Sequence, residues 1–245
     1  MPGFSARPGP RSLQRWLEAG VDLVFPPRCA GCGATGTEWC EVCDARLERI
    51  SPPICRCCGR PLDRARLCPD CRHKPFPLQT RAYAVYAGPL GHALLQMKYR
   101  PNRRLAEIMS GWLADLVSHE SWPIDLVVAV PLSVRRRTVR GYNQSELFAR
   151  RLSRRLGVSF ADGALLRTRD THSQVGLDPA ARAANVQGAF LAFGERVDGR
   201  SVLVVDDLVT TGATMAACHA ALETAGARRT YAVAIGRAQA RRIHS

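Results

Sequence analysis

The sequence predicts an α/β protein built on a doubly wound parallel sheet, preceded by a small cysteine-rich module. Residues 125–130 and 202–205 contain continuous runs of Val, Leu and Ala, which are typical of parallel strands covered on both faces. Residues 81–86 alternate and form a further predicted strand. An amphipathic helix is predicted at 103–119 and a further helix at 215–225, and this alternation of strands with helices favours the doubly wound arrangement.

The size and charge of the chain limit the classes of protein to which it can belong. Its 245 residues, 46% of them hydrophobic, suffice for one ordinary domain and a small module, which excludes a wholly disordered chain. A net charge of +14 favours anionic partners such as nucleotides, phosphosugars or nucleic acid. A genomic preference for Arg would explain why Lys74 and Lys98 are the only lysines, but not the excess of bases over acids.

No apolar run approaches the roughly 20 residues that a membrane-spanning helix needs, and no signal-peptide pattern is present at the N-terminus. We therefore expect a cytoplasmic protein without a membrane partner. Three parts are predicted. Residues 1–22 form a tail and a short amphipathic helix, residues 23–75 form the cysteine-rich module, and residues 76–245 form the main domain.

The most informative stretch is 201–214, where the second apolar run ends in two carboxylates and a turn of small residues. Ligands of parallel α/β sheets bind at the carboxyl ends of the strands, where Asp206 and Asp207 are expected. The turn contains a glycine and hydroxyl groups and precedes a predicted helix, so its backbone N–H groups are suited to a phosphate. The predicted phosphate-binding residues are Thr210, Thr211, Gly212, Ala213 and Thr214.

Two carboxylates are poor phosphate ligands, because like charges repel. They are suited to accept hydrogen bonds from sugar hydroxyls or to bind Mg²⁺, which prefers hard oxygen ligands. Two alternatives stay open here: an ordinary strand end with an N-cap, or an acidic magnesium pocket of the phospho-receiver kind, which leaves the turn unexplained.

Eight of the ten cysteines form four Cys-x-x-Cys pairs ahead of the main domain. Two such pairs turn four thiolates toward one point, which is the ligand set of structural zinc. We expect sequential pairing because it needs only short loops, with zinc sites formed by Cys29, Cys32, Cys40 and Cys43 and by Cys55, Cys58, Cys68 and Cys71. The alternatives are an interleaved cross-brace and a disulfide framework, the latter disfavoured in a cytoplasm.

The remaining cysteines and one histidine have different expected roles. Cys57 lies inside a pair and is expected to be a bystander, although its spacing from Cys55 competes with the preferred pairing. His73 is a possible substitute ligand but is expected to be solvated. Cys218 is expected to face the core as a small hydrophobic residue.

An arginine-rich segment follows the strand at 125–130. Arg135, Arg136, Arg137 and Arg140 are expected in a loop after the strand end, where guanidinium groups can bind an anion held at the same edge of the sheet. A second group of arginines, at 150–155, lies on a predicted helix with an apolar inner face and is expected to form a solvated basic face.

A polar segment between 167 and 190 is predicted to be either a lid over the anion site or an ordinary surface loop. A short helix is expected within it, starting after Asp178 and ending near Asn185. The candidate lid residues are Gln174, Arg182 and Asn185. His172 is a candidate acid or base, but a solvated histidine is the favoured interpretation.

The stretch 201–214 resembles the signature of type I phosphoribosyltransferases, which bind 5-phosphoribosyl-1-diphosphate (PRPP). The resemblance implies that Asp206 and Asp207 hold the ribose hydroxyls and that residues 210–214 hold the 5-phosphate, with Mg²⁺ bound together with PRPP. It also implies that the sheet is of the type I phosphoribosyltransferase kind.

The four motifs together, in their order, resemble the ComF family, which includes GntX-like relatives: a double Cys-x-x-Cys zinc-ribbon module, the sequence RRxxxRGYNQ, the segment of Gln174, Arg182 and Asn185, and VVDDxxTTGAT. Arg140, Gly141, Asn143 and Gln144 match positions of this family. The chain departs from it at Ser133, Val134 and Thr138, which places the contacts of the pyrophosphate loop in question.

The resemblance implies a link to competence and DNA uptake, and two functions are compatible with it. One is transfer of a phosphoribosyl group from PRPP to an unspecified acceptor, with Arg135 and Arg136 stabilising the departing pyrophosphate. The other is a non-catalytic protein that binds single-stranded DNA and a competence helicase-like partner, with PRPP as a regulatory ligand.

Overall fold

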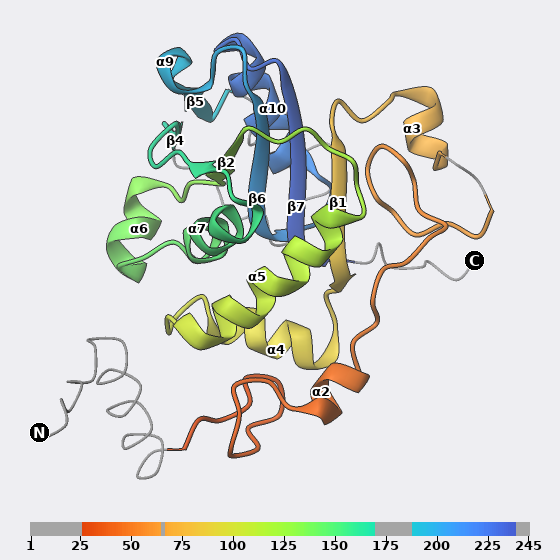
Figure 1. Cartoon of the computed structure of the whole chain (residues 1–245), viewed down its shortest axis with the longest axis vertical. Helices are drawn as coiled ribbons and strands as arrows, with labels where there is room; N and C mark the ends of the chain where they lie inside the picture. The colour runs from red at the N-terminus through yellow and green to blue at the C-terminus, as the bar shows by residue number, and fades with distance from the viewer. Residues whose placement is uncertain (1–25, 65–66, 170–187, 239–245) are drawn as a thin grey trace, which may run out of the picture.

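The computed structural model describes residues 26–64, 67–169 and 188–238, and within these ranges it contains a five-stranded parallel sheet (Figure 1). The strand order is β1-β7-β6-β2-β3. The strands are β1 (Gln79–Val85), β2 (Leu126–Ala129), β3 (Ser159–Phe160), β6 (Ser201–Val209) and β7 (Arg229–Arg237). A separate antiparallel pair is formed by β4 (Leu165–Arg167) and β5 (Phe190–Ala192).

Helices cover both faces of the sheet, as the continuous apolar runs predict. One face packs against α4 (Gly88–Gln96), α5 (Arg103–Ser118) and α7 (Gln144–Leu156), and the other against α10 (Ala213–Thr224) and the β4-β5 pair. Short helices complete the described chain: α2 (Glu41–Ala45), α3 (Pro69–His73), α6 (Val134–Arg140) and α9 (Gly194–Val197).

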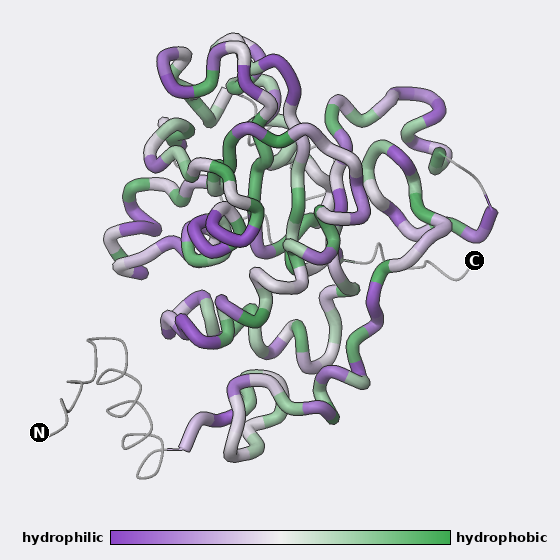
Figure 2. The backbone as a smooth tube through the Cα atoms, viewed as in Figure 1, coloured by the Kyte–Doolittle hydropathy of each residue, from purple (hydrophilic) through white to green (hydrophobic). Residues whose placement is uncertain are grey.

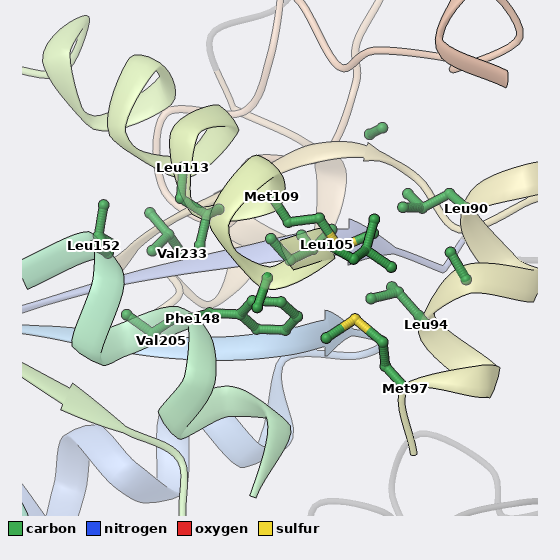
Figure 3. Packing of buried hydrophobic residues seen from close by; sticks show 14 of the residues in the cluster. Leu90, Leu94, Met97, Leu105, Met109, Leu113, Phe148, Leu152, Val205 and Val233 are labelled. Atoms are coloured by element: carbon green, nitrogen blue, oxygen red, sulfur yellow. The ribbon is translucent and has the colours of Figure 1, made fainter. Parts of the chain in front are cut away.

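Alternate residues of each central strand belong to different layers of the core. In β6, Leu203 and Val205 pack toward α5 and α7, whereas Val202 and Val204 pack toward α10. Figure 3 shows Val205 beside Phe148 of α7, with Leu105, Met109 and Leu113 of α5 above the sheet. Apolar colour accordingly concentrates on the strands and inner helix faces in Figure 2. The predicted doubly wound parallel sheet is confirmed.

Two predicted boundaries are wrong in an informative way. The helix predicted to begin at Met215 begins two residues earlier, at Ala213. Strand β6 does not end before the two carboxylates but continues to Val209, because β7 pairs with it as far as Arg237. Pairing with β2 on the other side stops at Ala129 opposite Val205, so the sheet is open on that side from Asp206 onward.

The cysteine-rich module consists of two halves that contact different parts of the main domain (Figure 1). The first half packs on α4 and α5, where Trp39 meets Trp112 edge to face at 5.4 Å and Glu38 accepts a 2.5 Å hydrogen bond from Asn102. The second half lies along the edge strand β1, where the Thr80 N–H donates to the Cys57 carbonyl at 2.8 Å.

A glycine allows the close approach of the second half to β1. Gly59 has a φ of +70°, and a Cβ atom there would collide with the Thr80 carbonyl oxygen. The predicted helices at the N-terminus and after Asp178 lie outside the described residues.

Candidate functional site

The two acidic residues of β6 are bonded to the first turn of α7. The Ser145 hydroxyl donates to Asp206 Oδ1 at 2.8 Å, and the Gln144 side-chain amide donates to Asp207 Oδ2. These contacts form because β2 ends before reaching the acids, which leaves their side free for α7. The N-terminus of α7 also carries the positive end of the helix dipole, which favours negative charge here.

The residue before these two fixes the position of α7. Asn143 is the N-cap, and its Oδ1 accepts from the Ser145 N–H at 3.1 Å. Its amide donates to the Val130 carbonyl at 2.9 Å, at the end of β2. Asn143 therefore ties the helix to one strand while Gln144 and Ser145 tie it to the next.

The environment of the acidic pair raises the pKa of Asp206 well above its ordinary value, first through burial and then through the charge of Asp207. A carboxyl group in this condition is stabilised in its charged form by a bound cation or by hydroxyl donors. Gln144 Oε1 lies beside the pair, is buried, and has no hydrogen-bond partner among the described residues. The pair and this acceptor together offer several oxygen atoms to a ligand.

The turn after β6 contains a glycine in the left-handed conformation and leads directly into α10. Gly212 is the N-cap of α10 with a φ of +85° and has no side chain of its own to cap this 12-residue helix. Thr211 is exposed, and its hydroxyl accepts from the Ala213 N–H at 3.3 Å. Thr210 and Thr214 are half-buried on either side. All five predicted residues lie at this turn.

The arginines predicted to lie in a loop lie instead on a helix, α6. Ser133 caps it by accepting from the Arg136 N–H at 3.5 Å, and Gly141 ends it in the left-handed conformation with φ of 72°. Arg135, Arg136 and Arg140 line a surface hollow of about 270 Å³. Neither Asp206 nor Asp207 lines this hollow, so the structure does not bring the acids and these arginines together in one pocket.

Lys98 and Tyr99 line the same hollow, and the sequence reasoning did not assign them a role. The available signal was that Lys98 is one of two lysines in an Arg-rich chain, beside an aromatic residue that is 73% exposed. Arg137 faces elsewhere and pairs with Glu146 at 2.5 Å.

The basic face of α7 is balanced by acids of neighbouring segments. Arg150 pairs with Asp162 at 2.6 Å, and Arg155 pairs with Glu107 at 2.7 Å. By contrast, four basic residues line the hollow at α6, namely Lys98, Arg135, Arg136 and Arg140. Gln174, Arg182, Asn185 and His172 lie outside the described residues.

The eight paired cysteines gather in two groups of four, in the predicted sequential pairing. Within each group the sulfur atoms lie within 4.8 Å of one another, and the Cys32–Cys40 and Cys58–Cys68 sulfur distances are 3.6 and 3.7 Å. A tetrahedral zinc with bonds of about 2.3 Å requires sulfur–sulfur edges of about 3.8 Å, so zinc fits both groups.

Backbone N–H groups favour the thiolate form of one cysteine in each group. Burial by itself would raise the pKa of Cys29, but N–H groups of Cys40, Cys32 and Gly31 donate to its sulfur and lower the pKa to about 6. The same arrangement at Cys55 also lowers its pKa to about 6. Cys57 belongs to neither group, His73 is exposed and Cys218 is buried, as expected.

Comparison with known proteins yields a double zinc ribbon domain at residues 20–72 and a phosphoribosyl transferase domain at residues 143–244. The DNA utilization protein YhgH of Escherichia coli K12 is 37% identical over 184 residues, which cover 72% of this chain and 80% of that protein. The chain belongs to the ComF family.

Two more distant relatives are named as competence proteins. Competence protein F of Haemophilus influenzae is 29% identical, with 72% of this chain and 80% of that protein covered. Competence protein ComFC of Bacillus subtilis is 29% identical, with coverages of 72% and 74%. Among solved structures, glutamine PRPP amidotransferase from B. subtilis gives a TM-score of 0.39 at 18% identity, over 57% of this chain and 30% of that chain.

The ComF motif RGYNQ occupies the junction between α6 and α7 in this structure. Arg140 lines the basic hollow, Gly141 ends α6, Asn143 caps α7, and Gln144 bonds Asp207. Ser133, a departure from the ComF pattern, is buried and caps α6. In the part of the chain that the structure describes, no helix has the length and apolar content needed to cross a membrane.

Proposed function

We propose that this ComF-family chain binds PRPP together with Mg²⁺ at the carboxyl edge of its sheet. The proposal rests chiefly on one arrangement: an acidic pair oriented by Gln144 and Ser145, directly followed by a phosphate-binding turn at the N-terminus of α10. The acids accept from ribose hydroxyls, and the turn holds the 5-phosphate through its N–H groups. The orphaned Gln144 Oε1 supports a polar ligand at this position.

Mg²⁺ fits the same edge because Asp206 and Asp207 supply hard oxygen ligands. When bound, the ion neutralises part of the diphosphate charge and so allows an anionic ligand to lie beside two carboxylates. The raised pKa of Asp206 is consistent with a site in which a bound cation or hydrogen-bond donors stabilise the charged carboxylates.

We further propose that the bound PRPP is a phosphoribosyl donor. An acceptor nucleophile attacks the anomeric carbon, the bond from this carbon to the diphosphate oxygen breaks, and pyrophosphate leaves with the electron pair. The sugar passes through a cationic state, so the protein contributes positioning and electrostatic stabilisation. Arg135, Arg136, Arg140 and Lys98 line one basic hollow, and their cationic groups are suited to stabilise pyrophosphate.

A second candidate is binding of single-stranded DNA without transfer. One observation favours it: Tyr99 is 73% exposed and lines the basic hollow with Lys98 and the α6 arginines. Aromatic side chains next to cations are the usual platform for single-stranded nucleic acid. In this case PRPP is a regulatory ligand, and a helicase-like competence protein is the expected partner.

The names of the relatives point to a role in DNA uptake or use, which we extend to this chain, with residues 76–245 as the PRPP-binding domain. Zinc ribbons that depend on eight reduced thiols support a cytoplasmic location. Isothermal titration with and without Mg²⁺ tests PRPP binding, and pyrophosphate release with base, amine and nucleic-acid acceptors tests transfer. PRPP binding without release of pyrophosphate in the presence of any of these acceptors would support the regulatory role and contradict the transferase activity.

A further inference from the structure

One residue, Phe76, contacts both the second zinc ribbon and the turn at 210–214. The backbone N–H of Phe76 donates to the sulfur of Cys71, one of the four thiols of the second group. The ring of the same residue packs both on that cysteine group and on the core beneath α10. Phe76 thus lies in the metal site and in the main domain at once.

The ring lies against the turn at its tightest point. A Cβ atom on Gly212 would be 2.6 Å from Phe76 Cζ and 2.9 Å from Cε2, so the ring occupies the space beside this residue. Gly212 also has a φ of +85°, and its conformation directs the first N–H groups of α10. A change in the ring position is therefore expected to change the shape of this turn.

A second contact joins the same two regions. Arg237, at the end of β7, donates to the Cys58 carbonyl and is 7% exposed. Its Cα pairs with Val209, the last residue of β6 before the turn, and the Ala238 N–H donates to the Val209 carbonyl at 2.9 Å. The second ribbon therefore contacts the turn itself through Phe76 and the residue before the turn, Val209, through Arg237.

The first ribbon has no such connection among the described residues. Its contacts run to α4 and α5, through Trp39 on Trp112, Glu38 on Asn102, and the Gly31 carbonyl on His92 at 3.3 Å. The two ribbons are therefore expected to differ in their effect on the turn.

We propose that Phe76 is a positioning residue through which zinc in the second ribbon, but not in the first, holds the phosphate-binding turn in its ligand-ready shape. The predicted effect of Phe76 on ligand binding rests on the PRPP function proposed above. The predicted effect of Phe76 on the order of the turn does not, because that order can be measured without ligand.

Hydrogen exchange of the amides at 210–214 in the zinc-loaded, ligand-free full chain is the first test. Phe76→Ala is expected to speed this exchange about tenfold while two zinc ions and the exchange of the sheet core are retained. Leu62→Ala is the matched control, because Leu62 packs on the same cysteine group. Unchanged exchange at the turn in Phe76→Ala would overturn the proposal, whether or not PRPP binds.

The metal sites provide the second test. Removal of the second site with Cys55→Ser/Cys68→Ser is expected to speed exchange at 210–214 as Phe76→Ala does, whereas Cys29→Ser/Cys43→Ser is expected to leave it unchanged. Equal effects of the two pairs would contradict a specific link to the second ribbon.

Titration of Mg²⁺-PRPP completes the design. Phe76→Ala is expected to bind about tenfold more weakly than wild type, as expected for a ligand site displaced by a fraction of an ångström. Phe76→Tyr, which adds a hydroxyl at the ring atom nearest Gly212, is expected to weaken binding as well. If wild type binds no PRPP, the proposed function fails while the exchange experiments still decide the role of Phe76. If wild type binds and both variants match it, the positioning role fails.

Discussion

The Ser145 hydroxyl donates a 2.8 Å hydrogen bond to Asp206 Oδ1 across 61 residues of sequence. The bond joins the RGYNQ motif to the acidic motif of β6 and gives the carboxylate one orientation. Ser145 is 3% exposed, so this contact is shielded from water.

Loss of this bond is expected to weaken PRPP binding. Ser145→Ala removes the hydrogen bond that orients Asp206, which is expected to cost about 1 kcal/mol of binding free energy, or about fivefold in affinity. Ser153→Ala is the matched control, because Ser153 is equally buried on the same helix and donates only to the Arg150 carbonyl, at 3.1 Å. Equal affinities of Ser145→Ala and Ser153→Ala in calorimetric titration would contradict the orienting role.

The raised pKa of Asp206 predicts a pH-dependent cost to stability. Its folded pKa lies above the ordinary value of 3.8, so the folded protein retains a proton that the unfolded chain has lost. Stability therefore falls as pH rises from 3.8 through the folded pKa and stays reduced above it. Asp206→Asn has no carboxyl group to ionise and so avoids this loss of stability. Its melting temperature relative to that of wild type is therefore expected to rise as pH increases from 3.8 through the folded pKa of Asp206. A difference that is independent of pH in thermal unfolding would show that the pKa is ordinary.

The hollow beneath α6 is expected to bind anions. Arg136→Glu is expected to weaken single-stranded DNA binding at low salt and to reduce its salt dependence, and Tyr99→Ala is expected to weaken it about tenfold through lost stacking. Arg154→Glu, an exposed change on α7 outside the hollow, is the control of equal charge. Mobility shifts that respond equally to Arg136→Glu and Arg154→Glu would assign the binding to net charge alone.

The cysteine grouping predicts zinc content directly. Wild type and Cys57→Ser are expected to hold two zinc ions per chain, because Cys57 contributes its carbonyl to Thr80 and no thiol to either group. Cys58→Ser is expected to hold one and to melt at a lower temperature, since structural zinc contributes to folding. Metal analysis that finds one zinc in Cys57→Ser would show that this thiol is a ligand.

The parts of the fold that the sequence predicts are those with a local signal. The continuous apolar runs at 125–130 and 202–205 predicted two buried strands, periodicity predicted the amphipathic helix α5, and the spacing of the cysteines predicted both metal groups. The loop predicted at 135–140 is a helix because Ser133 and Gly141 cap it, and an arginine run without apolar periodicity hides this.

The sequence predicted the residues of the candidate site but not the long-range contacts that position them. Asp206, Asp207 and the turn were recognised as one stretch, but their bonds to Gln144 and Ser145 depend on where β2 ends. Phe76 beside Gly212 likewise depends on the docking of the second ribbon. Such contacts join segments that are far apart in sequence, where periodicity carries no information.

Titration of Mg²⁺-PRPP into wild type, Asp206→Asn/Asp207→Asn and Asp162→Asn tests PRPP binding most directly. Asp162 is a surface acid paired with Arg150, and its substitution shows the effect of losing one carboxylate outside the proposed site. Wild type and Asp162→Asn are expected to bind alike, in about the micromolar to millimolar range, and the double variant is expected to bind at least about a hundredfold more weakly. Equal binding by all three proteins, or no binding by wild type, would contradict a PRPP site at this edge of the sheet.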